Sequence, residues 1–305
     1  MPRKDRIDLT GAVVLASLSI IFAFNQISIK YINDGFQPIF GAALRSVLAA
    51  GCIWLWMRAR GHSTAIAPGT VRLGLLLGLV YAAEFVCIFL SLDHTTVTRG
   101  TVILYTMPMW MALIAHFVIP GERMTPRKAA GLALAFGGMA LAVIDPERGA
   151  GGGSIAGDAL MLGGALLWAC LTLLSRTAGA RGMSSEMQVL WMQAVSVPVL
   201  LVASFAFGPF LRDPTVGEIG WLVFAAVVVV AGGFMIWFSM LAIYPASGVA
   251  SFTFLTPVLG LVLAWAMLGE PLSLALIAGG ALVLAGLVLV NRPGRQVPQK
   301  VRRTT

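Results

Sequence analysis

The sequence predicts an all-α, polytopic membrane protein with ten transmembrane helices, organised as two five-helix repeats of opposite orientation. Three observations support this fold class. The chain of 305 residues is 58% hydrophobic and only 11% charged, with a mean hydropathy of +0.89, which is too apolar for a water-soluble surface. Its apolar segments are long and continuous, whereas a β-barrel needs short alternating segments. Finally, two stretches of the chain share one pattern.

The apolar runs are long enough to cross a bilayer, because a hydrocarbon core of about 30 Å requires about 20 helical residues. Ten such segments fit the chain, and they leave almost nothing for a soluble domain. The predicted spans cover residues 11–31, 37–57, 71–92, 97–118, 127–145, 157–178, 185–207, 216–243, 247–268 and 273–291.

An internal repeat relates residues 98–145 to residues 247–291. Each copy reads as a Pro-bearing apolar helix, a Gly-Glu turn and a Gly-rich apolar helix. The matched positions are Pro108 with Pro257, Glu122 with Glu270, Gly131 with Gly279, and Gly138 with Gly286. Each half holds five spans, an odd number, so the second copy enters the membrane from the opposite face. Inverted repeats are typical of secondary transporters, whose halves exchange conformations around a midplane site.

The repeat and the composition divide the chain into segments. The first five-helix repeat covers residues 1–146 and the second covers residues 158–292. A Gly-rich linker, residues 147–157, joins them, and a basic tail follows at residues 293–305.

The basic residues predict orientation. A net charge of +8 in a soluble chain suggests a nucleic-acid partner. With the amino terminus inside, however, most of the 21 Lys and Arg residues fall in cytoplasmic segments. The outer segments hold only Lys30, Arg99, Arg148 and Arg212. This is the positive-inside distribution, so we predict cytoplasmic termini and no nucleic-acid partner.

Two opposite charges lie inside neighbouring spans. Arg45 lies about 12 Å from the outer end of the second span, and Glu84 lies at about the same depth in the third. We therefore expect an ion pair, whose role is either structural or functional, because an ionisable group inside a membrane is a functional candidate by default. In the second half Gly233 stands at the position that matches Glu84.

Few groups are available for catalysis or metal binding. The three cysteines, Cys52, Cys87 and Cys170, lie within predicted spans and have no metal-ligand spacing. Only three histidines occur, and neither Gly-x-Ser-x-Gly nor His-Glu-x-x-His is present. We therefore expect no metal, no cofactor and no enzymatic activity. Nothing resembles the charged ring or selectivity filter of a channel.

The duplicated Pro–Gly-Glu–Gly units, with Asn25, Lys30, Pro38 and Arg45 in the first spans, resemble the drug/metabolite transporter superfamily, in particular the EamA-type ten-helix exporters. The resemblance covers nearly the whole chain and is strongest to the YddG-type bacterial exporters of aromatic and other amino acids. Phe22-Ala23 replaces the Trp-Gly usual before the Asn. The resemblance implies a bundle around a central cavity, lined by spans 1, 3, 4, 6, 8 and 9, and efflux across the bacterial inner membrane.

Candidate substrate-binding residues lie in the interior of those spans. Aromatic rings there can stack on planar groups or cations, although such rings also pack between helices or face lipid. The aromatic candidates are Tyr81, Tyr105, Trp110, Trp168, Trp237 and Phe252. Asn25 can bind an ammonium group, together with backbone carbonyls freed where Pro108 and Pro257 kink their helices.

The predicted function is therefore export of amino acids, aromatic and other, or of related metabolites by alternating access. In this scheme Arg45 attracts a carboxylate, and Glu84 serves proton coupling or binds a cationic substrate. The alternative is a carrier of drugs, quaternary cations or nucleotide sugars with the same fold. The expected partners are the small-molecule substrate and membrane lipids, with the protein a monomer or weak homodimer.

Overall fold

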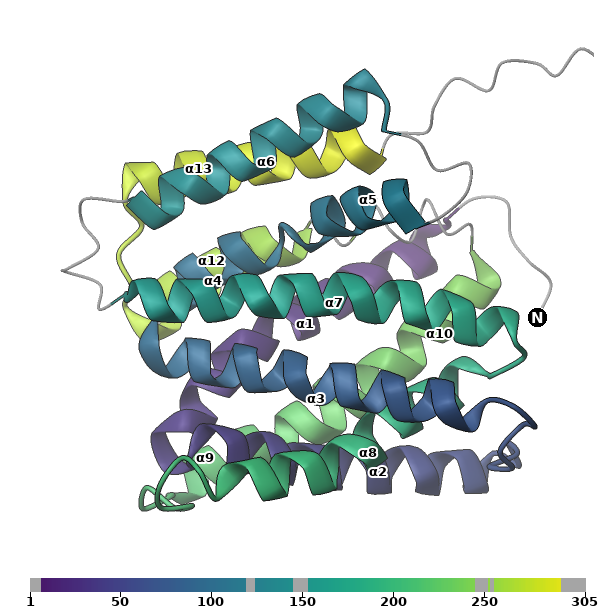
Figure 1. Ribbon diagram of the computed structural model, residues 1–305. Helices are drawn as coiled ribbons and strands as arrows, with labels where there is room; N and C mark the ends of the chain where they lie inside the picture. Colours follow the sequence, from purple (N-terminus) through teal and green to yellow (C-terminus); the bar gives the residue numbers. More distant parts are fainter. Residues whose placement is uncertain (1–6, 119–123, 145–152, 245–251, 253–254, 292–305) are drawn as a thin grey trace, which may run out of the picture.

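The computed structural model describes residues 7–118, 124–144, 153–244, 252 and 255–291, and these form helices joined by short turns (Figure 1). Within them an isolated bridge between Phe36 and Leu211 is the only β-type pairing. The helices are α1 (Leu9–Gly35), α2 (Pro38–Ala59), α3 (Val71–His94), α4 (Val97–Leu104), α5 (Met107–Val118), α6 (Pro126–Ile144), α7 (Ile155–Ala180), α8 (Ser185–Ser204), α9 (Val216–Val223), η2 (Phe224–Gly233), α10 (Phe234–Ile243), α12 (Leu255–Leu268) and α13 (Leu274–Asn291).

The described helices make this a polytopic membrane protein. Seven described segments of 18 residues or more are apolar enough to cross a membrane: α1, α2, α3, α4 with α5, α7, α8, and the segment Val216–Trp237. Two shorter apolar helices correspond to α12 and α13. The fifth predicted span is occupied by α6. The all-helical membrane fold is thereby confirmed, whereas the count of ten spans stays a prediction.

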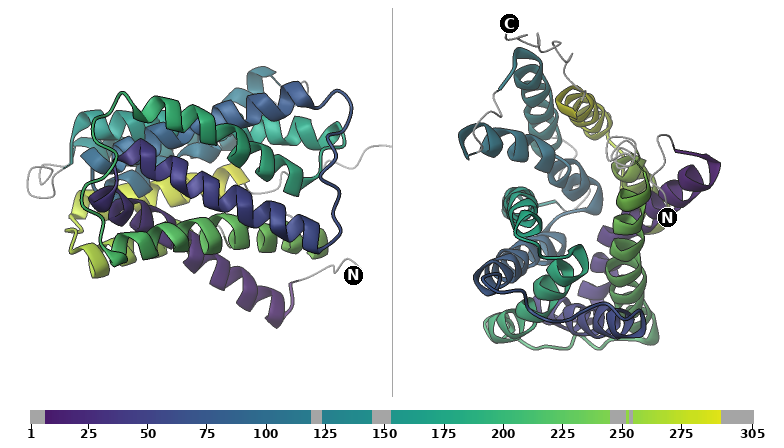
Figure 2. Two further views of the ribbon diagram at one scale, coloured as in Figure 1. Left: turned by 90° about the horizontal axis from the view of Figure 1, so that it is seen from below. Right: turned by 90° about the vertical axis from the view of Figure 1, so that its right-hand side faces the viewer.

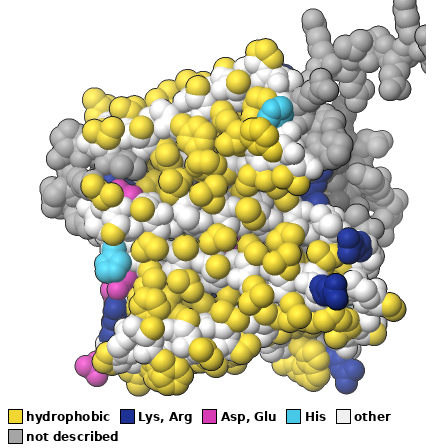
Figure 3. Space-filling model, viewed as in Figure 1, with side chains coloured by type: hydrophobic (Ala, Val, Ile, Leu, Met, Phe, Trp, Pro, Cys, Tyr) yellow, Lys and Arg dark blue, Asp and Glu magenta, His cyan; other side chains and the backbone are white. Residues whose placement is uncertain are grey.

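Charged side chains lie at the two ends of the bundle and apolar side chains cover its sides. Figure 3 shows this on one face, where hydrophobic side chains fill the middle and coloured charged groups mark the left and right edges. We call the end that holds His94, Asp158 and Arg212 the outer end, and the end that holds His62 and Arg181 the inner end, after the predicted orientation. Figure 2 (right) views the helices nearly end on.

Polar side chains fix where several helices begin. The first backbone N–H groups of a helix have no partner within the helix, and here side chains accept their hydrogen bonds. Asp8 accepts from Gly11 N in α1, and Ser154 accepts from Gly157 N in α7. In α9, Thr215 and Glu218 form a reciprocal capping box.

One predicted span is interrupted within the described residues, and it contains one of the two prolines of the repeat. This fourth span breaks between α4, which ends at Leu104, and α5, which begins at Met107. Pro108 is the second residue of α5. Because proline has no N–H and clashes with the preceding turn, the chain bends before it. Pro257 lies in the first turn of α12, and residues 253–254 before it are outside the described part.

The eighth predicted span contains a π-helix, η2, between α9 and α10. It ends at the pair Gly232-Gly233 and lies against the first two helices. A Cβ atom at Gly233 would stand 2.8 Å from a ring carbon of Phe22 in α1. The glycine therefore allows the close approach of η2 to α1, near mid-membrane.

Helices α6 and α13 pack tightly against each other and form the upper layer in Figure 1. Glycines make this approach possible. A Cβ atom at Gly131 would stand 2.8 Å from the carbonyl oxygen of Gly286, and one at Gly279 would stand 2.6 Å from that of Gly138. The contacts are reciprocal, because Gly131 matches Gly279 and Gly138 matches Gly286 in the predicted repeat. Such reciprocity is what a two-fold relation between the halves requires.

On the opposite side of the molecule α2 packs against α8, and α3 packs against both α7 and α8. At the α2–α8 interface Ser196 Oγ donates to Ser46 Oγ at 3.0 Å. The buried aromatic residues Phe85 and Phe89 of α3 belong to the largest apolar core of the described residues. Arg45 and Glu84, the two charged residues that the sequence analysis placed inside neighbouring spans, lie in this wall of helices.

Candidate functional site

Arg45 lies within the wall formed by α2, α3 and α8 and is fully buried. Its Nη2 donates to the hydroxyl of Tyr81 at 3.1 Å. The guanidinium carbon lies 3.9 Å from the ring centroid of Phe85 and 5.1 Å from that of Phe89. Such cation–π contacts stabilise a desolvated guanidinium by about 2 kcal/mol. The arginine is therefore held by aromatic faces and by one hydroxyl.

The hydroxyl of Tyr81 receives two donors. Besides Arg45 of α2, Gln193 Nε2 of α8 donates to it at 2.8 Å. Tyr81 is only 3% exposed, so its ring and its hydroxyl are both occupied by protein contacts. Tyr81 thus links three helices, and in this conformation it is not open to a substrate.

The predicted ion pair between Arg45 and Glu84 is not formed directly. Glu84 is 4% exposed, and its Oε2 has no hydrogen-bond partner among the described residues, nor have Nε and Nη1 of Arg45. The two groups still interact electrostatically. Tyr81, one helical turn before Glu84, binds the guanidinium of Arg45 instead.

Two other predicted residues meet across the halves. The rings of Tyr105, just after α4, and Trp168 of α7 lie 6.4 Å apart in an edge-to-face arrangement, and both residues are partly exposed. The ring of Trp110 of α5 instead packs against that of Phe136 of α6, with the centroids 4.7 Å apart, and its indole N–H donates to Thr106 Oγ1. The ring pair Tyr105–Trp168 thus brings together two aromatic candidates, one from each half.

The remaining predicted residues lie near α1. Trp237 of α10 belongs with Phe252 to an apolar cluster around Leu15 and Leu18 of α1. Asn25 is partly exposed, and its backbone carbonyl accepts from Ser28 Oγ. The structure therefore distributes the predicted site residues over three places: the Arg45 wall, the Tyr105–Trp168 pair and the α1–α10 cluster.

The outer end holds a charged network that the sequence did not reveal. Arg99 Nη2 donates to Asp158 Oδ2 at 2.6 Å, with side chains 5% and 3% exposed. Thr95 Oγ1 donates to the other carboxylate oxygen of Asp158 at 2.9 Å. Lys30 Nζ donates to the carbonyls of Leu92 and Thr95. The network ties α1, α3 and α4 to the first turn of α7.

Glu270 closes the same end from the second half. Its carboxylate accepts from the backbone N–H groups of Val97 and Thr98, at 2.8 Å each, and from Thr98 Oγ1 at 2.8 Å. These donors are the first N–H groups of α4, where a negative charge is favourable. The matched residue Glu122 lies outside the described residues. The Gly-Glu turn was recognised as a repeat signature, but its role as a helix cap was not predicted.

The inner end shows a related but simpler contact. Tyr244, which follows α10, donates through its hydroxyl to Oδ1 of Asp8 at 2.6 Å. A Cβ atom at Gly11 would stand 2.6 Å from the Tyr244 ring, so the glycine admits the tyrosine against α1. At the outer surface, by comparison, Arg212 binds Asp93 through two hydrogen bonds, which raise the pKa of Arg212 above its ordinary value.

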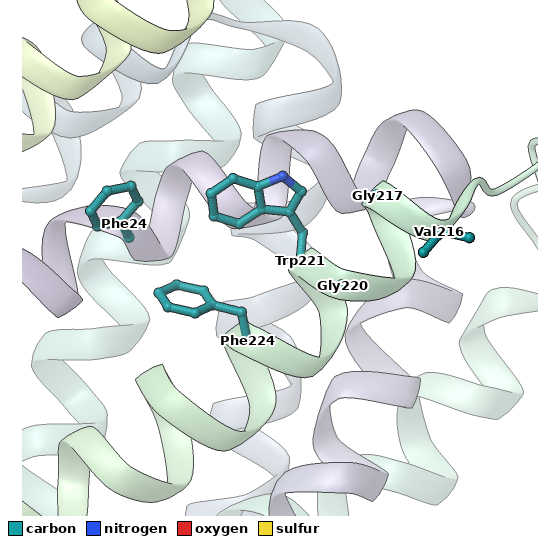
Figure 4. Close-up of a pocket in the computed structure, with 6 residues that line it drawn as sticks. All are labelled: Phe24, Val216, Gly217, Gly220, Trp221 and Phe224. Atoms are coloured by element: carbon teal, nitrogen blue, oxygen red, sulfur yellow. The ribbon is translucent and has the colours of Figure 1, made fainter.

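A shallow apolar pocket of about 410 Å³ lies between α1 and α9 (Figure 4). Stacked rings form its wall. The ring centroid of Trp221 lies 6.2 Å from that of Phe24, which also lines the pocket, and 5.1 Å from that of Tyr31. The lining residues are Phe24, Val216, Gly217, Gly220, Trp221 and Phe224. None of them is a predicted substrate-binding residue, and the lining suits an apolar chain rather than a charged solute.

These features define a multi-pass helical membrane protein whose buried polar groups join distant spans. Comparison with known proteins then gives the family. The model of the EamA-like transporter family matches residues 9–144 and again residues 155–292, and the chain belongs to this family. It is therefore a membrane-embedded transporter with a small-molecule substrate.

Individual relatives agree with the family. The chain is 29% identical to the "Uncharacterized transporter YvbV" of Bacillus subtilis, covering 92% of this chain and 91% of that one. It is 24% identical to a "Probable amino-acid metabolite efflux pump" of Escherichia coli, covering 95% of each. A crystal structure with 21% sequence identity has a similar fold, with a TM-score of 0.64 over 92% of this chain and 96% of that one.

Proposed function

We propose that this protein is a secondary transporter that exports amino acids, aromatic ones included, and related small metabolites across the bacterial inner membrane. Two inverted five-helix repeats, residues 1–146 and 158–292, work by alternating access, with both termini in the cytoplasm. One observation carries the proposal: at each end of the bundle a hydroxyl group at the end of one helix donates to an aspartate at the start of another.

The two contacts correspond within the repeat. Thr95 donates to Asp158 at the outer end, and Tyr244 donates to Asp8 at the inner end. Thr95 and Tyr244 are separated along the chain by the same interval as Pro108 and Pro257. In each case the end of one helix is tied to the start of a helix from the other half. Alternating access requires such matched closures, because each half takes the role of the other when the carrier reverses.

The serine pair at the α2–α8 interface fits the same scheme. Ser46 and Ser196 occupy nearly matched positions in the two halves and bind each other, as residues on a two-fold axis do. The glycine contacts between α6 and α13 are reciprocal as well. We therefore place the pivot of the movement between these two interfaces.

The candidate substrate site lies between the pivot interfaces. Tyr105 and Trp168 come from different halves and remain partly exposed, so they can stack on a planar side chain and change their separation as the halves move. The predicted lining of the site also includes Asn25, Trp110, Trp237 and Phe252. Pro108 bends the helical segment that carries Trp110. A ring contact is worth about 0.5–1.5 kcal/mol.

The amino-acid assignment draws on the relatives that are described as probable amino-acid metabolite efflux pumps. It is tested with purified protein in proteoliposomes and a panel of radiolabelled phenylalanine, a small neutral amino acid, a quaternary ammonium cation and a nucleotide sugar. We expect transport of the amino acids. Transport of the cation or the nucleotide sugar alone would make the protein a carrier of that alternative class, and transport of none would remove the proposal.

Substitution of one ring tests the site. Trp168→Ala removes the partner of Tyr105, and we expect the affinity for phenylalanine to fall up to about tenfold. Trp54→Ala is the matched control, because Trp54 is 45% exposed on α2 and is not one of the predicted substrate-binding residues. Equal effects of both variants would show that the Tyr105–Trp168 pair does not bind substrate.

Glu84 is the proposed coupling residue. It is the acidic side chain that lies deepest in the predicted spans, and it interacts with Arg45. We expect Glu84→Gln to abolish the effect of an imposed pH gradient on transport while facilitated exchange of substrate continues. An unchanged rate and unchanged response to the gradient would exclude Glu84 from coupling.

A further inference from the structure

Four buried polar atoms of Arg45, Glu84 and Gln193 have no hydrogen-bond partner among the described residues. They are Nε and Nη1 of Arg45, Oε2 of Glu84 and Oε1 of Gln193. All three side chains are less than a tenth exposed. A buried polar atom without a partner costs about 1–3 kcal/mol, and more where the group is charged. Four such atoms in one place are far more than packing alone tolerates.

These atoms belong to one cluster. Arg45 Nη2 and Gln193 Nε2 both donate to the Tyr81 hydroxyl, at 3.1 and 2.8 Å, so the free atoms of both groups lie close to that oxygen. Glu84 is three residues after Tyr81, on the same face of α3. It also interacts electrostatically with Arg45. The cluster therefore joins α2 and α3 of the first half to α8 of the second.

The free atoms are chemically complementary. Arg45 supplies two donors, whereas Glu84 and Gln193 each supply an acceptor. They do not reach one another directly, so a molecule that both donates and accepts is needed between them. Water has this property, and a buried water makes about three hydrogen bonds to polar groups that otherwise lack partners.

We propose that Arg45, Tyr81, Glu84 and Gln193 form an internal water-binding site. The bound water bridges Arg45 to Glu84 and Gln193, and it provides the path by which Glu84 exchanges a proton. In this site Tyr81 is a positioning residue, because its hydroxyl holds the guanidinium so that the free edge faces the water, whereas Gln193 holds the Tyr81 hydroxyl through Nε2 and accepts from the water through Oε1. Gln193 makes the site dependent on the second half of the molecule.

The surroundings of Glu84 contain few other ionisable groups. Arg45 of α2, with Tyr81 and Cys87 of α3, are the groups that interact with it electrostatically. The charged groups of the neighbouring helices α1, α7 and α8 are engaged near the helix ends. On α1 these are Lys30, bound to the carbonyls of Leu92 and Thr95, and Asp34, which interacts with Lys30 and Arg212. On α7 they are Arg176 and Asp158, which is bound to Arg99, and on α8 Glu186, near His62.

The test is radiolytic hydroxyl labelling of the purified protein in lipid nanodiscs, read residue by residue by mass spectrometry. Radicals generated from bound water modify the side chains beside it. We expect Tyr81 to be labelled as fast as the partly exposed Tyr31 despite its own 3% exposure. Absence of Tyr81 labelling, while Tyr31 reacts, would overturn the proposal.

A variant pair on α8 separates bound water from general exposure. Gln193→Leu removes one acceptor of the water, which weakens its binding by about one hydrogen bond and lowers Tyr81 labelling about tenfold. Gln188→Leu is the control: Gln188 is also buried, but it contacts Ser175 and the carbonyl of Met183. Equal Tyr81 labelling in wild type and Gln193→Leu would contradict the assignment.

Glu84→Gln keeps the shape and one acceptor of the site. We expect Tyr81 labelling to remain within about twofold of wild type, because the amide still binds water. Complete loss of labelling in this variant would show that the charge, and not the hydrogen-bonding pattern, holds the site open, and would overturn the proposal. No substrate is used in these measurements, so they stand whether or not transport of amino acids is observed.

Discussion

At the outer end the hydroxyl of Thr95 donates to Asp158, and at the inner end the hydroxyl of Tyr244 donates to Asp8. The hydroxyl-bearing residues and the aspartates occupy corresponding places in the two halves, but the residues around the two aspartates differ. Asp158 also binds the buried Arg99, whereas the residue that matches Arg99 in the second half is Gly248. The outer closure therefore includes a buried ion pair with an arginine whose matched position in the second half is a glycine.

This difference shows how two corresponding contacts can contribute different amounts to the free energy of unfolding. A buried hydrogen bond to a carboxylate contributes about 1.5–3 kcal/mol, and less where it is partly exposed, as at Tyr244, whereas removal of one partner from a buried ion pair destabilises by about 3–5 kcal/mol. The network also includes Lys30 and the Glu270 cap of α4. We infer that the described conformation is held chiefly at its outer end.

The largest expected effect comes from Asp158→Ala, which deprives Arg99 of its carboxylate. We expect the free energy of unfolding to fall by about 3 kcal/mol or more, as measured by denaturant titration in detergent micelles. The control is Asp93→Ala, which removes the partly exposed partner of Arg212 and should cost about 1 kcal/mol or less. Similar losses in the two variants would contradict the assignment of the outer end to a buried ion pair.

A smaller effect is expected from Glu270→Ala. The substitution removes the acceptor of two backbone N–H groups at the start of α4, and such a cap is worth about 1–2 kcal/mol. Hydrogen exchange at Val97 and Thr98 should accelerate while exchange in α8 stays unchanged. If exchange at the start of α4 did not respond, Glu270 would not be its cap.

The smallest effect is expected at the inner end. Tyr244→Phe removes one hydroxyl and its bond to Asp8, with a loss of about 1 kcal/mol in thermal or denaturant unfolding. Thr95→Val makes the corresponding change at the outer end, where Arg99 still binds Asp158. If Tyr244→Phe lowered the free energy of unfolding more than Asp158→Ala, the inner contact would be the stronger one, contrary to this account.

The fold was largely readable from the sequence, because apolar run length and charge bias are local properties. The placement of Arg45 and Glu84 inside neighbouring helices followed from the span pattern, and both side chains are buried. Their partners did not follow from that pattern, since Tyr81 and Gln193 are ordinary span residues that only a side-chain arrangement can place beside Arg45. Arg99 was assigned to an outer segment, yet it is buried, because its partner Asp158 lies 59 residues further along the chain.

The most direct test of the opposed halves is the side of the membrane from which positions just after the two matched Gly-Glu turns are labelled. In a background free of Cys52, Cys87 and Cys170, single cysteines replace Thr125 and Leu272, which follow Glu122 and Glu270. Membrane-impermeant maleimide is applied to intact cells and to everted vesicles. We predict labelling of position 125 only in everted vesicles and of position 272 only in intact cells. Labelling of both positions from the same side would contradict the inverted arrangement and the alternating-access function with it.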